Sequence, residues 1–104
     1  MTAPLLSERQ YKQLTMMCSD YADRINALLD DEQDRLTKFQ LEKLFDLLKL
    51  VSQLDVYLHN IRLFQKNKKT RQAMQTTITV GVLLDILMCD EEKLKQSNIY
   101  LEVH

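Results

Sequence analysis

The internal histidine, His59, is the side chain best suited to chemistry in this sequence, because an imidazole titrates near neutral pH. Asp55 lies four residues before it and Arg62 three residues after it, so the three side chains share one face of a helix. We interpret them as a charged border around a packing surface, with a recognition cluster or a pH-sensitive contact as alternatives. Acid–base catalysis needs a second reactive group nearby in a pocket, and no Ser or Cys lies one turn away on this face. We therefore predict that the protein is not an enzyme and has no catalytic residue.

A metal or nucleotide site is not expected either. The chain has two cysteines, Cys18 and Cys89, and two histidines, His59 and His104, which form no CxxC, HxxxH or HExxH pair. Its one glycine, Gly81, excludes the glycine-rich loops that bind phosphates. We predict no metal and no cofactor, and we expect both thiols to be buried as small hydrophobic side chains.

Residues 61–72 form a basic segment inside a chain whose net charge is -1. The segment contains no acid, and it is interpreted as a solvated loop, as a contact for an acidic protein or as a contact for nucleic acid. Nucleic-acid binders usually have a basic domain, and the pI of about 6.1 makes this third interpretation the weakest. The five bases are Arg62, Lys66, Lys68, Lys69 and Arg71.

The composition predicts an all-α fold. Gly and Pro occur once each in 104 residues, whereas folds built from strands need many turns with special backbone angles. A chain of this length that is 45% apolar suits one domain, 1–104, with its own core. We predict a bundle of three long helices with a short fourth C-terminal helix, and a dimeric state.

The helix boundaries follow from caps and apolar spacing. Ser7 and Thr37 are good N-caps for the first two helices. Residues 76–82 are rich in β-branched side chains and fit a strand locally, but a lone strand has no partner here and a helix is favoured. The expected helices are 7–30, 38–66, 71–89 and 90–97, with Asp90 as the expected cap of the last one.

The segment from Lys38 to Phe64 carries more apolar surface than one helix normally buries. Two rows of apolar residues, spaced three and four apart, cover about 220° of its circumference, against roughly 100° for an ordinary surface helix. We expect the chain's own helices to cover one row and a partner to cover the other. The row expected to bind a partner, here called the predicted groove, is Leu47, Leu50, Leu54, Tyr57, Ile61 and Phe64.

A helical protein with surplus apolar surface and no reactive site is typical of a protein-binding module. We predict a chaperone, adaptor or anti-activator that holds the amphipathic helix of another protein in the predicted groove, with self-association as a homodimer. A nucleic-acid-associated regulator that uses residues 62–71 is one alternative, and a structural subunit of a larger assembly is another. The charged residues expected around the groove, here called the predicted rim, are Asp55, His59, Arg62, Lys66, Lys68, Lys69 and Arg71.

The sequence also bears on location. Residues 1–6 lack the basic start and apolar run of a signal peptide, and the best apolar window, 78–89, is shorter than a membrane span and contains Asp85. We therefore expect a cytoplasmic protein with no membrane partner. The tail, 98–104, is apolar enough to dock on the bundle or on a partner.

Overall fold

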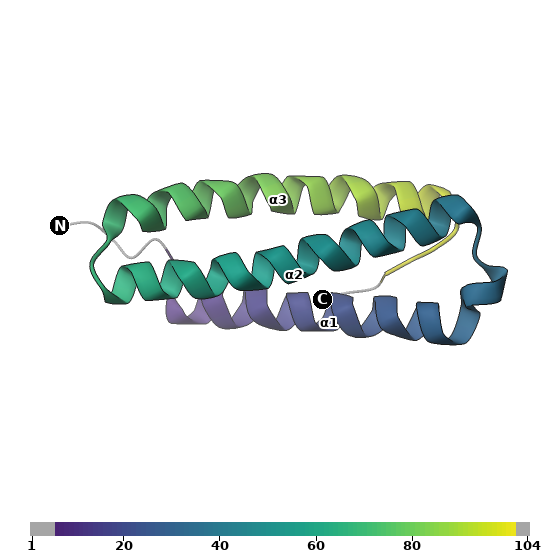
Figure 1. Cartoon of the computed structure of the whole chain (residues 1–104), viewed down its shortest axis with the longest axis horizontal. Coiled ribbons are helices and arrows are strands. Elements are labelled where there is room, and N and C mark those ends of the chain that lie inside the picture. Colours follow the sequence, from purple (N-terminus) through teal and green to yellow (C-terminus); the bar gives the residue numbers. More distant parts are fainter. Residues whose placement is uncertain (1–5, 102–104) are drawn as a thin grey trace.

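Three long helices make up most of the computed structural model, which describes residues 6–101. Helix α1 spans Glu8–Glu32, α2 spans Lys38–Lys66 and α3 spans Thr70–Gln96, with a short 3-10 turn, Gln33–Arg35, after α1. Successive helices run antiparallel, and the molecule is elongated, 53 × 19 × 18 Å (Figure 1). No strand occurs between residues 6 and 101, so the expected all-α bundle of three helices is confirmed.

The first two helices begin at the caps expected from the sequence. The Ser7 hydroxyl accepts a hydrogen bond from the Gln10 backbone N–H at 3.1 Å, and the Gln10 side chain accepts one from the Ser7 N–H at 3.0 Å. Thr37 and Gln40 repeat this arrangement at the start of α2. These reciprocal pairs satisfy two backbone donors that a helix start otherwise leaves unpaired, which fixes where each helix begins.

Helix α2 is the central element, and it packs against both α1 and α3. It supplies more core residues than either neighbour, because apolar residues from both of its rows turn inward. The buried residues of α2 face two neighbouring helices, α1 and α3, and this accounts for the unusual width of its apolar surface. Its buried residues are Leu44, Leu47, Leu50, Val51, Leu54, Leu58 and Ile61.

The C-terminal half of the chain differs from the sequence expectation in one respect. The segments 71–89 and 90–97, expected as two helices, form the single continuous helix α3. Asp90 was expected to cap a separate helix, but its side chain is buried and its carboxylate lies 3.7 Å from the Lys43 ammonium on α2. With the carboxylate directed at another helix, Asp90 does not act as a cap and the helix continues.

The β-branched run in α3 is helical and not a strand. The hydroxyls of Thr76, Thr77 and Thr79 each donate to the carbonyl four residues earlier, at 2.8, 2.8 and 3.2 Å. These bonds satisfy the threonine hydroxyls within the helix itself. Val80 completes the run with its side chain in the core. Packing against α2 therefore outweighs the weak local preference for a strand.

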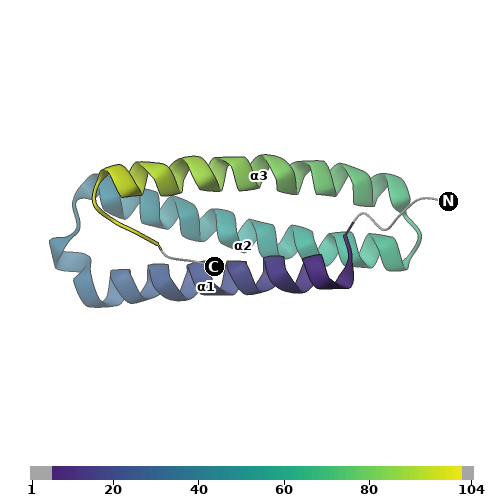
Figure 2. The same ribbon diagram turned by 180° about the vertical axis from the view of Figure 1, so that it is seen from behind.

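The segment after α3 folds back onto the bundle. Asn98 adopts a left-handed conformation with φ 66°, and the next residue, Ile99, donates its N–H to the Leu94 carbonyl at 2.9 Å. Ile99 and Leu101 are buried, and the segment runs back toward α1 (Figure 2). Residues 98–101 of the tail thus dock on the bundle. The remaining residues of the tail, 102–104, lie outside the described residues.

Candidate protein-binding surface

The apolar members of the predicted groove lie in the core of the chain itself. Leu47, Leu54 and Ile61 are at most 1% exposed, and Leu50 is also buried. The neighbouring row of α2 is buried with them, because α2 has a helix on each side. In this structure the four side chains are not accessible to a partner helix, so any docking surface has to be sought elsewhere.

The two aromatic members of the predicted groove, Tyr57 and Phe64, are partly exposed and lie at the border of the core. A shallow pocket of about 360 Å³ on α2 is lined by Tyr57 together with Val56 and three polar residues. The other exposed apolar side chains of α2 are seven or more residues from Val56, about 10 Å or more along the helix; they are Phe39, Phe45 and Leu63. These are isolated side chains on a polar surface, which are common in soluble proteins.

The outward side of α3 carries a longer apolar surface. Its side chains are 43–68% exposed from Met74 to Ile86, and they are spaced four residues apart along the helix. No charged residue occurs from residue 72 to residue 84. Cys89 extends the surface and is exposed, contrary to the expectation that both thiols are buried. We call this surface the outer α3 face and define it as Met74, Ile78, Val82, Ile86 and Cys89.

Helix α3 is exceptional among the described elements in a second way. By length and composition it is apolar enough to cross a membrane, yet only 17% of its most apolar stretch is buried in the structure. The core helix of a soluble bundle can be equally apolar because neighbouring helices cover most of its surface. Here one side of α3 packs on α2, whereas the opposite side has no cover from residues 6–101 although it carries Met74, Ile78, Val82 and Ile86.

Charged residues interrupt and flank this face at regular intervals. One stripe along α3 has a residue every seven positions, which is about two helical turns. It contains three charged residues and one apolar residue, in the order Arg71, Ile78, Asp85 and Glu92. All four are exposed. The stripe is basic at its N-terminal end and acidic toward its C-terminal end.

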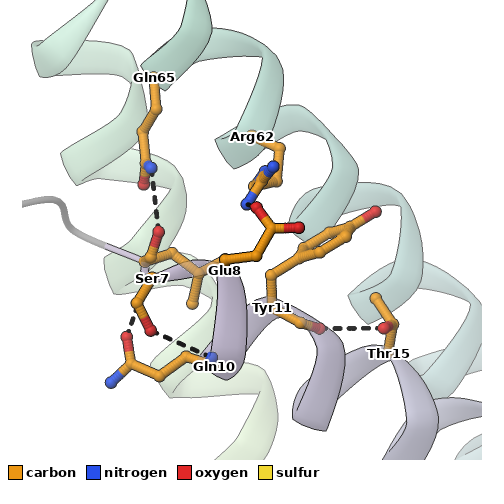
Figure 3. Close-up of polar contacts among 8 residues, drawn as sticks. Ser7, Glu8, Gln10, Tyr11, Thr15, Arg62 and Gln65 are labelled. Atoms are coloured by element: carbon orange, nitrogen blue, oxygen red, sulfur yellow. Dashed lines mark hydrogen bonds and ion pairs between the residues drawn. The ribbon is translucent and has the colours of Figure 1, made fainter.

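Part of the predicted rim gathers at the other side of the molecule, where α1 meets α2. The Arg62 guanidinium pairs with the Glu8 carboxylate at 2.7 Å and stacks over the Tyr11 ring, 4.9 Å from its centroid (Figure 3). The Tyr11 and His59 rings meet edge to face at 5.7 Å. The His59 Nδ1 donates to the Asp55 backbone carbonyl at 2.8 Å, so the ring is held on its own helix.

An open pocket of about 580 Å³ lies at this junction and is lined by Tyr11, His59, Arg62, Lys66 and two further residues. The Arg62 charge that could attract an anion is already paired with Glu8. The main evident effect of these contacts is to attach the start of α1 to the end of α2. The interpretation of Asp55, His59 and Arg62 as a charged border around a packing surface stays a prediction.

The remaining bases of the predicted rim lie around the turn between α2 and α3. Lys66, Lys68, Lys69 and Arg71 are exposed, and none forms an ion pair with another residue of the range 6–101. Lys68 has a left-handed backbone with φ 59°, which lets the chain reverse. Their charges are available to a partner that approaches the N-terminal end of α3.

The outer α3 face was missed in the sequence analysis although its signal is present. The window 78–89 was identified as the most apolar in the chain, but it was tested only as a membrane span. Placing Met74, Ile78 and Val82 on a helical wheel puts them opposite the buried Val80 and Leu87. Two apolar sides on one helix would have indicated two partners.

Comparisons with known proteins give no relative from which a function could be transferred. No family model, no curated protein and no solved structure matches this chain.

Proposed function

We propose that this chain is a cytoplasmic protein-binding module, of the chaperone, adaptor or anti-activator kind, that receives a partner helix on the outer α3 face. The observation that carries the proposal is the exposure of this face along a helix whose other side is buried. A homodimer formed through the same surface belongs to this proposal.

The energetics of the outer α3 face support this function. Burial of apolar surface contributes roughly 25 cal/mol per Å², so each 100 Å² of this face that a partner covers contributes about 2.5 kcal/mol before the cost of association is subtracted. The side chains are aliphatic or sulfur-containing, and Met74 and Met88, an exposed residue beside Cys89, can adapt to a partner's shape. A helix laid along α3 would find apolar contacts over several turns.

The proposal replaces the predicted groove with a different surface for the same binding mode. The leucines and Ile61 of the groove hold α2 in the core, so aspartate at those positions would unfold the protein. Substitutions on the outer α3 face instead remove exposed side chains, and their effects on binding and on folding can be separated.

The test is affinity purification from the native host with the wild-type chain and with Ile78→Asp and Val82→Asp. We expect the recovery of specific partners to fall at least tenfold with both variants, because a charge in a buried apolar contact is strongly unfavourable. Circular dichroism should show unchanged helix content, since Ile78 and Val82 are more than half exposed.

Met16→Asp is the matched control. Met16 is an exposed apolar residue on α1, 66% exposed, and lies outside the outer α3 face. Its variant should bind partners as the wild type does. Partners that are retained equally by the wild type, Ile78→Asp and Val82→Asp would contradict the proposed function.

A further inference from the structure

We propose that the helix received by the outer α3 face is α3 of a second copy of this chain, running antiparallel about a two-fold axis that passes between Ile78 and Val82. This inference rests on the proposed function, since it uses the same surface and names its partner. The result is a symmetric dimer with two α3 helices side by side at its centre.

The charge pattern of the stripe favours a second copy in this orientation. When the axis lies close to Ile78, Arg71 of one copy is opposite Asp85 of the other. When it lies closer to Val82, Arg71 is opposite Glu92 instead. In both registers an exposed base meets an exposed acid within one turn, and the two-fold symmetry forms each pair twice. The surface is therefore complementary to itself.

A parallel pair of α3 helices is disfavoured by the same residues. It would place Arg71 against Arg71, and Asp85 against Asp85, along an otherwise apolar contact. Like charges across an interface suppress that arrangement, whereas opposite charges set the register and orientation. The antiparallel pair also places the macrodipoles of the two helices in opposite directions.

The size of α3 suits a dimer contact. A helix of 27 residues is about 40 Å long and about 10 Å wide, so one side of it offers several hundred Å². Stable interfaces bury about 800 Å² on each partner. The exposed residues of α3 that flank this strip add to the contact area.

The charge-free middle of α3 matches the centre of such an interface. Residues 72–84 contain no charge, and they include the glycine Gly81, whose missing side chain faces open space. Protein interfaces usually have few charged residues at their centre and polar or charged residues at their rim. The proposed axis passes through this segment.

Sedimentation equilibrium of the purified wild-type chain is the first measurement. We expect a dimer at about 10 μM and a monomer for Ile78→Asp, with Met16→Asp dimeric as the control. A monomeric wild type at 100 μM would overturn the inference. A monomer that co-sediments with vesicles of phosphatidylcholine and phosphatidylglycerol would also overturn it, and would identify a membrane as the occupant of the face.

Cysteine cross-linking tests the orientation. With an axis near residue 80, the two Cys89 residues are 18 residues apart along the helices, about 27 Å, whereas a disulfide needs Cα atoms within about 7 Å. Mild oxidation should therefore leave the wild type without covalent dimers. In a Cys89→Ser background, Ile78→Cys combined with Val82→Cys should cross-link readily, because an axis near residue 80 places position 78 of one copy opposite position 82 of the other. The opposite result, cross-linking through Cys89 and not through positions 78 and 82, would exclude the antiparallel arrangement.

Charge reversal tests the register and separates this inference from the proposed function. Arg71→Glu should raise the dimer dissociation constant about tenfold, and adding Asp85→Arg and Glu92→Arg in the same chain should restore it. No restoration would contradict the charge pairing. A monomer whose host partners are lost in Ile78→Asp would refute the second copy and leave the proposed function standing. A dimer unaffected by Ile78→Asp would refute the second copy on this face, and host partners retained equally by that variant would refute the proposed function as well.

Discussion

The two cysteines show how differently single residues of one type are placed in this bundle. Cys18 is 3% exposed in the core on α1, whereas Cys89 is exposed on the outer α3 face. Burial, and to a smaller extent the Asp55 carboxylate, raises the pKa of the Cys18 thiol from 9.0 to about 11. Cys18 therefore acts as a small hydrophobic side chain, as expected, while Cys89 lies where a partner can cover it.

Thiol titration tests this difference. Ellman's reagent should label one thiol within minutes in the native protein and the second only after unfolding, because the buried Cys18 remains protonated and inaccessible. Cys89→Ser should abolish the fast phase. Two equally fast thiols would contradict the burial of Cys18. In a dimer built on α3, the fast phase should slow as protein concentration rises.

The raised pKa of Cys18 also predicts a dependence of stability on pH. The folded state holds the thiol proton more tightly than the unfolded state, so the stabilisation is complete below pH 9 and is lost as the pH rises toward 11. Tyr21, whose pKa is raised by burial and by its hydrogen bond to Glu91, acts in the same direction at higher pH. Urea unfolding of the wild type and Cys18→Ala between pH 8 and pH 10 should show a smaller decrease for the variant.

At the scale of the element, α3 combines a stable helix with features that weaken helices locally. Its N-cap position, Lys69, makes no side-chain cap, in contrast to the capping boxes at Ser7 and Thr37. Gly81 lies in the middle of α3, where glycine costs about 1 kcal/mol relative to alanine. Because α3 has no capping box and contains a glycine, its helical conformation depends on packing against α2. Helices α1 and α2 depend less on packing, since capping boxes stabilise their first turns.

Gly81→Ala should stabilise the folded monomer by roughly 0.5–1 kcal/mol, since the new methyl group meets no atom within 4 Å and the helix gains propensity. Urea unfolding at a protein concentration low enough for the monomer to dominate measures this gain. A loss of stability in the monomer would show that the surroundings of Gly81 are more crowded than the structure indicates. Weaker dimerisation in the same variant would place Gly81 in the proposed contact.

At the scale of the whole molecule, the segment after α3 ties the ends of the helices together. The Gln40 side chain on α2 donates to the Ser97 carbonyl at 2.8 Å. Tyr100 and Leu101 lie beside the C-terminal half of α1, where they line an open pocket of about 210 Å³ with five α1 residues. The segment thus connects all three helices, and it closes one end of the elongated bundle.

Leu101→Ala should lower the free energy of unfolding by about 2–3 kcal/mol, because it removes a buried leucine side chain and leaves a cavity. Tyr100→Ala is the matched control on the neighbouring residue. Tyr100 is 60% exposed, so its loss should change stability by less than about 0.5 kcal/mol. Equal effects of the two substitutions in thermal or urea unfolding would contradict the docking of this segment.

The fold class, the three long helices and the starts of the first two helices could be predicted from the sequence. Scarce Gly and Pro, helical apolar spacing and the N-caps Ser7 and Thr37 are local signals, and local signals fix helix boundaries. The width of the apolar surface of α2 also indicated correctly that this helix needs neighbours on more than one side.

Which apolar surfaces remain exposed depends on how the helices pack, and the sequence did not show this. Helical periodicity shows which residues share a face, but the arrangement of the neighbouring helices decides which face is covered. The two helices beside α2 buried the leucines of the predicted groove and left the outer α3 face exposed instead. A contact between helices, from Lys43 to Asp90, likewise occupies the carboxylate that had indicated a helix break. Such contacts join residues far apart in the sequence, so no local pattern contains them.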